Sequence, residues 1–314
     1  MDDSLQTSKT TRKKIDISKY VFIGATLIIP VACFIVFYLV VNFNSIVMAF
    51  QRFDLEKEEY VWGGLENFNT FFELIKSEDK LRYAFRNSAI TLLLNLCISL
   101  PLCLFVSYCI MEKLPFFGFF KVVLFLPSII SAYALVMVGE QVITQVLPEF
   151  FDIPDNVLTG GREQFITITI YSLFIGFSGN MVLYIGGMSS VSKDIMEYSR
   201  IDGCGFMRRF IYVVLPAIWP TITTMMITLF THFFVSYGSF FSFLDQWAEP
   251  ESYTLGYYLY VMIYRSTQAG GATSKAQFGE YPLAAAMGVA FTLIAIPIVF
   301  GVRWAMTKFG PKEE

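Results

Sequence analysis

Six apolar runs, each near the ~20 residues that a helix needs to cross a hydrocarbon layer, constrain the fold of this chain most. Polar segments separate them, and they occupy residues 20–41, 85–111, 117–143, 165–188, 217–244 and 281–306. Hydrophobic residues make up 55% of the chain, which is more than most water-soluble domains carry. The first run is too long for a signal peptide and lacks a small-residue cleavage site, so we expect a retained anchor. The runs predict an all-α integral membrane protein with six transmembrane helices.

The distribution of charge predicts which side of the membrane each connection faces. More than half of the 23 Lys and Arg residues lie in residues 1–19, Glu112–Lys121, 189–216 and 307–314, whereas most of the 26 Asp and Glu residues lie in the other connections. Lys and Arg are enriched in cytoplasmic loops. We therefore expect a six-span domain over residues 20–306, with both terminal tails and the 189–216 loop in the cytosol.

The loop between the fourth and fifth runs contains its own helical pattern. Lys193–Pro220 is the longest polar island in the second half of the chain. Asp202-Gly203 is a strong turn signal, because Gly adopts the left-handed backbone that closes a helix. We expect one helix to end at Gly203 and a second, over Phe206–Val214, to enter the membrane near Leu215-Pro216. Such a helix–Gly–helix elbow is suited to docking a partner.

The residues of this elbow resemble a known family. The stretch E-Y-S-R-I-D-G-C-G, followed by V-x-L-P, is similar to the EAA loop of membrane subunits of ABC importers. The chain departs from the usual family pattern at Tyr198 and Ser199, where two alanines are usual, and Val213 replaces Ile. The resemblance implies that the loop couples the chain to an ATPase through Glu197, Asp202, Gly203, Gly205, Leu215 and Pro216. The alternative is an amphipathic loop held on the lipid surface by Arg208 and Arg209.

Further matches extend the resemblance over about residues 20–306 and indicate the carbohydrate-importer type, in particular the larger membrane subunit of maltose transporters. They fall at Gly64–Phe68, Phe85–Ser88, Phe125–Ser131 and Phe278–Ala286. The segment Trp247–Lys275 departs from the family, so its outer surface is expected to differ. The resemblance implies a heterodimer with a second, homologous permease in the bacterial cytoplasmic membrane. It also implies two cytosolic ATPase subunits, an extracytoplasmic binding protein and a carbohydrate substrate, with no nucleic-acid partner.

Catalytic signatures are missing from the sequence. It contains no G-x-x-x-x-G-K-[ST] phosphate loop, no H-E-x-x-H pattern and no nucleophile elbow. Five Cys residues without metal-like spacing and a single His argue against a metal site. We expect a transporter subunit that is not an enzyme and binds no cofactor, with ATP and Mg on the partner ATPases.

Polar side chains interrupt the fourth and fifth runs and are the candidates for a solute path. Their spacing of four places Gly176 above Asn180, and His232 above Ser236, on one face of each helix. The positions proposed to line a shared cavity are Gly176, Gly179, Asn180, His232, Phe233, Ser236 and Tyr237. The alternative is that small residues allow close helix packing and that hydroxyls bond within their own helix.

Two other functions stay open at this stage. The same type of importer could carry a non-sugar solute such as glycerol phosphate, and the sequence does not specify which sugar. A secondary carrier or channel is the second alternative. Such proteins usually keep charged groups at the bilayer centre, and no acidic residue falls in the middle of the runs of this chain.

Overall fold

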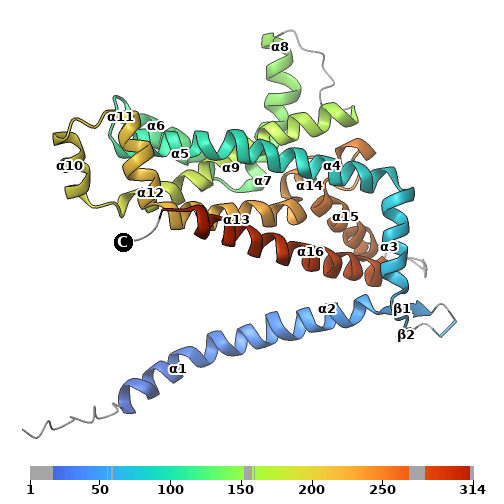
Figure 1. The fold of residues 1–314 in the computed structure, drawn as a ribbon. Coiled ribbons are helices and arrows are strands. Elements are labelled where there is room, and N and C mark those ends of the chain that lie inside the picture. Colours follow the sequence, from blue (N-terminus) through green and yellow to red (C-terminus); the bar gives the residue numbers. More distant parts are fainter. Residues whose placement is uncertain are drawn as a thin grey trace, which may run out of the picture. The chain divides into compact units, whose positions relative to one another are not determined.

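The computed structural model describes residues 17–54, 56–57, 59–151, 158, 160–268 and 280–311 (Figure 1). These residues are helical apart from one short hairpin. Residues 1–16, which form most of the predicted N-terminal tail, and residues 312–314 lie outside the described residues. The chain divides into two units, Met1–Met48 and Ala49–Glu314.

The described residues of the first unit, 17–48, form a single long helix. It comprises α1 (Ile17–Cys33), the π-helical η1 (Phe34–Val40) and most of α2 (Val41–Ala49). Phe22–Ala49 has the length and apolarity of a membrane span, and its most apolar window has no buried residue. A helix that is apolar all round and has no protein neighbour in its own unit is suited to lipid contact. The predicted first span, 20–41, thus falls within a continuous helix, and the apolar stretch of that helix ends later than expected.

The second unit begins with an antiparallel hairpin. Strand β1 (Gln51–Asp54) pairs with β2 (Glu59–Trp62), in a register that sets Gln51 opposite Trp62. Gly64 has a φ of 62°, which turns the chain from β2 into helix α3 (Glu66–Ser77). The second span then runs through α4 (Asp79–Leu94), η2 (Asn95–Ser99) and α5 (Leu100–Met111). It begins earlier than the predicted residue 85, because the polar first turns of α4 continue the helix out of the apolar run.

The predicted third span over 117–143 is not one continuous helix in the structure. The structure has α6 (Phe117–Ile129) and α7 (Ala132–Gln141), which meet at an angle of 107°, and then η3 (Val142–Val146) and α8 (Leu147–Phe151). Ile130 is extended, and Ser131 caps α7 by accepting a bond from the Ala134 N–H at 3.3 Å. Pro127 lacks an N–H and weakens the last turn of α6. Among the residues that the structure describes, five helices are long and apolar enough to span a membrane, and the count reaches six only if this bent pair is one span.

The remaining spans are α9 (Gly161–Ser189), the pair α13 (Trp219–Val235) and α14 (Gly238–Leu244), and α16 (Glu280–Phe309). Between α9 and α13 lie the short elements of the elbow. They are α10 (Lys193–Ile201), α11 (Phe206–Arg209), the π-helical η4 (Phe210–Val214) and α12 (Leu215–Ala217). The fourth, fifth and sixth predicted spans thus correspond to helices, although the fifth is interrupted after Val235.

The segment from Asp245 to Glu280 was expected to be a polar connection, and the structure corrects this. After η5 (Pro250–Ser252), helix α15 (Leu255–Gln268) packs into the unit, with Leu255 and Tyr257 at 0% exposure. Tyr-rich helices score as only weakly apolar, yet their rings bury large areas. Residues 269–279, which include the start of the last family match, lie outside the described residues.

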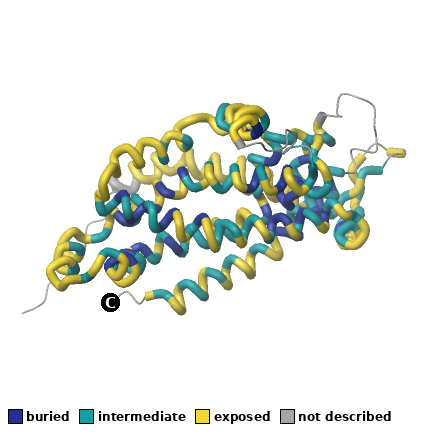
Figure 2. Tube along the Cα trace, turned by 90° about the horizontal axis from the view of Figure 1, so that it is seen from above, coloured by how far each residue is buried: buried dark blue, intermediate teal, exposed yellow. Residues whose placement is uncertain are grey.

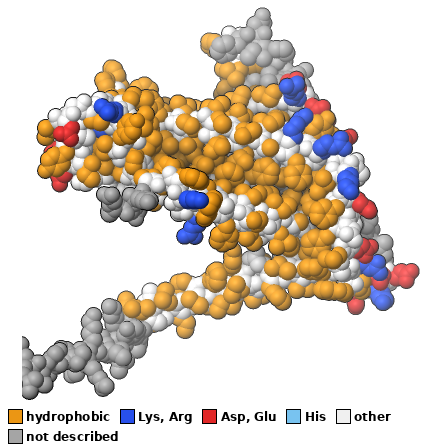
Figure 3. All heavy atoms as spheres, in the orientation of Figure 1, with side chains coloured by type: hydrophobic (Ala, Val, Ile, Leu, Met, Phe, Trp, Pro, Cys, Tyr) orange, Lys and Arg blue, Asp and Glu red, His pale blue; other side chains and the backbone are white. Residues whose placement is uncertain are grey.

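Two hydrophobic clusters hold the second unit together, and Figure 2 shows buried positions gathered toward its two ends. One cluster joins α3, α4, α13, α15 and α16, with Phe71, Leu81 and Phe291 among its members. The other joins α5 and α9 to η4 and α13, with Tyr108 and Val214 fully buried. On the face shown in Figure 3, hydrophobic side chains cover the middle of this unit, and charged side chains gather around α10 and along the edge near α3. This is the distribution expected for a protein whose middle lies in lipid.

Candidate functional site

A cavity of about 540 Å³ lies between the second span, α9 and α13. Fourteen of its lining residues carry a hydroxyl, amide or imidazole group. They are Ser88, Thr91, Asn95, Ser99, Thr169, Ser172, Asn180, Tyr184, Thr228, His232, Ser236, Tyr237, Ser239 and Thr254. No Asp, Glu, Lys or Arg is among the lining residues of the described chain. The wall can therefore donate and accept many hydrogen bonds without presenting a formal charge.

The structure brings together six of the seven residues predicted to form a solute path. Gly176 and Asn180 of α9 and His232, Phe233, Ser236 and Tyr237 near the end of α13 all line this cavity. Gly179 does not line the cavity. It lies about 60° around the axis of α9 from Gly176, on the side away from Asn180. Gly176 has no heavy atom within 4 Å of the place a Cβ would occupy, so it leaves open space at the wall.

The predicted stacking of Ser236 above His232 on one helix face is only partly correct. Helix α13 ends at Val235, and Ser236 is its C-cap, with its N–H donating to the His232 carbonyl at 3.0 Å. The Thr254 hydroxyl donates to the Ser236 carbonyl at 2.7 Å. Gly256 lies so close to this break that a Cβ on it would be 2.5 Å from the Val235 carbonyl carbon. The break in the fifth span is thus fixed by the start of α15.

Sequence reasoning missed the wall contributed by the second span. Thr91, Asn95 and Ser99 follow one another at intervals of four and line the cavity. This spacing inside an apolar run was the signal that could have found them. The Asn95 amide donates to the Thr91 carbonyl at 2.9 Å, and the backbone is π-helical from Asn95 to Ser99.

Two hydroxyls at this wall are buried without a hydrogen-bond partner in the described part of the chain, Thr91 Oγ1 and Thr169 Oγ1. They come from different spans. Buried polar groups in proteins are usually paired, since an unpaired group costs free energy. These two hydroxyls are available to water or to a solute in the cavity.

The elbow forms as the Asp-Gly signal predicts. Gly203 has a φ of 73°, and the N–H of Cys204 donates to the Ser199 carbonyl at 3.0 Å, which closes the end of α10. Gly205 precedes α11 with ordinary backbone angles. The predicted helix over 206–214 is present, although its second half is π-helical. Leu215 and Pro216 start α12 and are half-buried.

Helix α10 and the turn after it are exposed at most positions of the proposed coupling set. Glu197, Asp202 and Gly203 are exposed. Three large apolar side chains at intervals of three are also exposed on α10, and they are Ile195, Tyr198 and Ile201 at 52%, 68% and 80%. A stripe of apolar side chains on an exposed helix indicates a surface that contacts something other than water.

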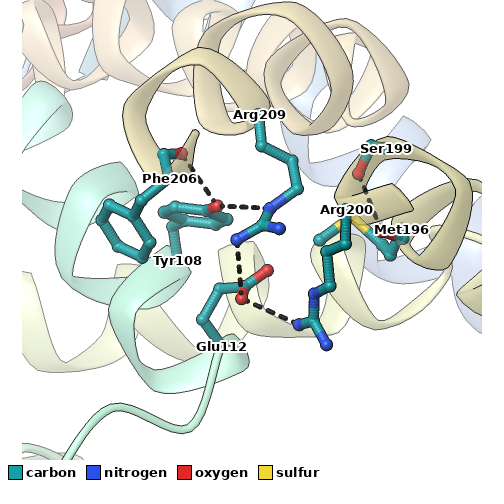
Figure 4. A network of polar contacts seen from close by, with 7 residues as sticks. All are labelled: Tyr108, Glu112, Met196, Ser199, Arg200, Phe206 and Arg209. Carbon is teal, nitrogen blue, oxygen red and sulfur yellow. Dashed lines mark hydrogen bonds and ion pairs between the residues drawn. The ribbon is translucent and has the colours of Figure 1, made fainter. Parts of the chain in front are cut away.

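A buried ionic network joins the elbow to the end of the second span (Figure 4). Glu112, directly after α5, accepts at its Oε2 from Arg200 at 2.9 Å and from Arg209 at 3.2 Å. Its side chain is 7% exposed and that of Arg209 is 10% exposed. The Tyr108 hydroxyl donates to the Phe206 carbonyl at 3.1 Å and accepts from Arg209 Nε at 3.4 Å. Glu112 therefore bonds to both arms of the elbow.

This network corrects the alternative in which Arg208 and Arg209 hold the loop on the lipid surface. Arg208 is exposed, but Arg209 is buried and ion-paired. The hydrogen bond to Tyr108 and the neighbouring Glu112 carboxylate raise the pKa of Arg209 above its ordinary value, so it stays charged. Within the described residues, no group of three His, Cys, Asp or Glu side chains could hold a metal ion.

The sequence pattern of one family, described as "Binding-protein-dependent transport system inner membrane component", matches residues 113–313. The chain belongs to this family. The match includes the elbow and the α9 and α13 walls of the cavity, and the predicted resemblance to importer membrane subunits is thereby confirmed. Membership and the apolar helices together make this component a multi-pass membrane protein.

Relatives of this membrane component share modest identity with it. The probable ABC transporter permease protein YesP of Bacillus subtilis is 22% identical over 231 residues, which cover 70% of this chain and 71% of YesP. The maltose/maltodextrin permease protein MalF of Vibrio vulnificus is 27% identical over 150 residues, which cover 46% of this chain but only 28% of MalF. A bacterial alginate ABC transporter, solved in complex with an alginate pentasaccharide-bound periplasmic protein, has a similar fold. Its TM-score is 0.70 at 20% identity, over 94% of this chain and 98% of that one.

Proposed function

We propose that this chain is the permease subunit of an ATP-driven importer and forms half of the path for a sugar or oligosaccharide. The observation that carries the proposal is the uncharged, hydroxyl- and amide-lined cavity between three spans of a chain of this family. A sugar needs many hydrogen-bonding partners, and aromatic neighbours such as Phe233 and Tyr237 cover its apolar faces. The names of MalF and of the alginate transporter support a carbohydrate substrate.

The charge of the cavity wall separates this proposal from its main alternative. A phosphorylated solute such as glycerol phosphate is best held by Arg or Lys, which pair with phosphate oxygens. The part of the wall that this chain supplies contains neither among its described residues. A neutral solute is therefore favoured over an anionic one. A secondary carrier is disfavoured because the described wall offers no Asp or Glu carboxylate for ion coupling.

The elbow is proposed to dock one of two cytosolic ATPase subunits, which bind ATP and Mg themselves. The exposed α10 would enter the ATPase surface through Glu197 and its apolar stripe, with Asp202, Gly203 and Gly205 shaping the turn and Leu215 and Pro216 leading into α13. The family description supports delivery of solute by a binding protein. A second, homologous permease would complete the cavity.

The proposed orientation places both termini and the 189–216 loop in the cytosol, with residues 1–19 and 307–314 as tails. It rests on the Lys and Arg distribution. A reporter fused after Gly310 should be active in the cytosol, and one inserted at Glu56 should be active outside. An external signal after Gly310 would reverse the orientation.

The decisive experiment measures solute uptake by the reconstituted importer with its binding protein in excess. Gly176→Leu should lower uptake roughly tenfold or more, because the side chain fills the open space at the wall. Gly179→Leu is the matched control on the same helix and should transport at the parental rate, since Gly179 does not line the cavity. His232→Ala should lower uptake roughly two- to tenfold through the loss of a hydrogen bond.

Competition identifies the solute class in the same assay. An oligosaccharide should compete for uptake, and glycerol phosphate should not. Equal uptake by Gly176→Leu and Gly179→Leu would show that the solute path lies elsewhere.

A further inference from the structure

We propose that Glu112 is a positioning residue for energy coupling, which ties both arms of the elbow to the cavity-lining second span. The inference rests on the proposed function, because it assumes that the elbow docks an ATPase. It concerns a residue outside the docking surface and outside the cavity.

The first observation is where the three charged partners lie. Arg200 is on α10, before the Asp202-Gly203 turn, and Arg209 is on α11, after it. One carboxylate oxygen, Glu112 Oε2, accepts from both guanidinium groups. The angle between the two arms is therefore fixed by a residue that belongs to neither (Figure 4). Removing Glu112 would release both arms at once.

The second observation is that this arrangement is not the most stable way to fill the space. Glu112 Oε1 is buried and has no hydrogen-bond partner in the described part of the chain. Burying charges is costly, and well-packed apolar side chains often stabilise a protein as much as a buried ion pair does. A half-satisfied carboxylate facing two arginines is therefore hard to explain by stability alone. An ion pair does offer directional bonds that fix one geometry between two elements.

The third observation is that the second span connects Glu112 to the cavity wall. From Glu112, α5 runs without a break to the π-helical residues Asn95–Ser99 at the cavity wall, over roughly 25 Å. Tyr108 stacks on Phe210 at a ring distance of 4.8 Å, and both belong to a buried cluster that joins α5 to η4. Helix α5 is thus packed firmly against the elbow. A displacement of the elbow would reach the cavity wall through this helix.

The turn after Glu112 supports the same role. Lys113 and Phe116 have positive φ values of 53° and 63°, which side chains other than glycine rarely adopt. Such backbone strain persists where the surrounding structure fixes it. The carboxylate is held between a rigid helix and a constrained turn, so it has little freedom to follow the elbow by itself.

The test separates coupling from stability in the complete importer, reconstituted in vesicles with its ATPase subunits and binding protein. Glu112→Gln should leave assembly with the ATPase intact and lower the amount of sugar transported per ATP about fivefold or more. Arg209→Gln should have the same effect, and the double variant should be no worse than either single variant, because the residues act as one unit. Arg208→Gln is the matched control, since it removes an exposed positive charge at the neighbouring position.

A second variant excludes a purely structural explanation. Replacement of both partners, Glu112→Leu with Arg209→Leu, should give an importer whose thermal unfolding midpoint equals or exceeds that of the parent but whose sugar transport per ATP stays low. If this apolar pair or Glu112→Gln transports as much sugar per ATP as the parent, Glu112 has no coupling role. Failure of the proposed function is distinguishable, because the parental importer would then show no ATPase stimulation by the binding protein.

Discussion

The two ends of the second span are held in opposite ways. At the end near α15, the buried Asn87 amide donates to the carbonyls of Glu251 and Tyr253 at 2.6 and 2.9 Å, and the Leu255 N–H donates to Ser88 Oγ at 3.0 Å. These bonds join uncharged groups, and each involves a backbone N–H or carbonyl. At the elbow end, Glu112 and its two arginines bond through long, charged side chains. The α15 end is built as a fixed anchor, and the elbow end as a joint whose two sides can be displaced together.

Other contacts extend this contrast. At the α15 end, Ser252 is fully buried and its hydroxyl lies 2.6 Å from the Gly161 carbonyl and 2.8 Å from Gln164 Oε1. Burial and a bond to the Glu78 carboxylate raise the pKa of Tyr258 above its ordinary value, so this hydroxyl remains a donor. Helix α10, in contrast, has no buried residue. The comparison teaches that α15 is held at one end of the second span by buried neutral bonds, whereas the elbow is tied to the other end but keeps α10 exposed for a partner.

The largest expected effect comes from removing the anchor. Asn87→Ala leaves the Glu251 and Tyr253 carbonyls without their donor, and should destabilise the protein by roughly 2–4 kcal/mol. The measurement is the thermal unfolding midpoint of the detergent-solubilised importer. Asn69→Ala is the control, because Asn69 is exposed. Equal midpoints for the two variants would mean that the α15 end is not an anchor.

A somewhat smaller loss is expected where α15 meets the break in the fifth span. Gly256→Ala places a methyl group 2.5 Å from the Val235 carbonyl carbon and should cost roughly 1–3 kcal/mol. It should also lower uptake, because Ser236 at the cavity wall must shift. Gly238→Ala, at the start of α14, has open space for the methyl group and should keep the parental unfolding midpoint. If both variants keep the parental unfolding midpoint and uptake, the contact between α15 and the break neither stabilises the protein nor positions Ser236.

Two glycines with the same backbone geometry allow the comparison to be sharpened. Gly203 in the elbow has a φ of 73°, and Gly64 near the hairpin has a φ of 62°. A Val at either position should cost about 1–2 kcal/mol locally, since a Cβ is strained in the left-handed conformation. Gly203→Val should lower ATPase recruitment and uptake, whereas Gly64→Val should leave both near parental levels. A similar loss of ATPase recruitment in the two variants would show that the elbow and the hairpin region do not differ in function.

The smallest effect is expected for an exposed ion pair. Arg52 and Glu66 lie 3.5 Å apart and are each 57% exposed, so Glu66→Gln should change stability by about 0.5 kcal/mol or less. The unfolding midpoint at low and high salt tests this. A shift in the unfolding midpoint as large as that caused by Glu112→Gln would show that burial does not distinguish the Arg52–Glu66 pair from the Arg209–Glu112 pair.

Most of the predicted apolar runs coincide with long helices, and Asp202-Gly203 with a turn between two short helices, because both depend on local signals. Apolar runs of sufficient length specify spanning helices, and Asp202-Gly203 specifies the turn. The bend at Ile130–Ser131 was missed, since Pro127 is compatible with a membrane helix and the Ser131 cap is recognised only in the structure. Helix α15 was missed because its tyrosines give it only weak apolarity, although the helix packs deeply in the unit.

The candidate site was predicted in part for the same reason. Gly176, Asn180 and His232 stood out as polar or small residues in apolar runs, and they do share one cavity. The role of Glu112 could not be predicted, because its partners Arg200 and Arg209 are far from it in the chain. Gly179 was predicted to line the cavity but does not, since rotation about the helix axis decides whether Gly176 or Gly179 faces it.

The anchor at Asn87 also has a consequence for biogenesis. Its acceptors lie 164 and 166 residues farther along the chain, so the ribosome must make most of the protein before they exist. Until then, the newly inserted second span presents an amide and a serine hydroxyl without their final partners. Insertion and tertiary folding are therefore separate events, and the interval between them is set by translation.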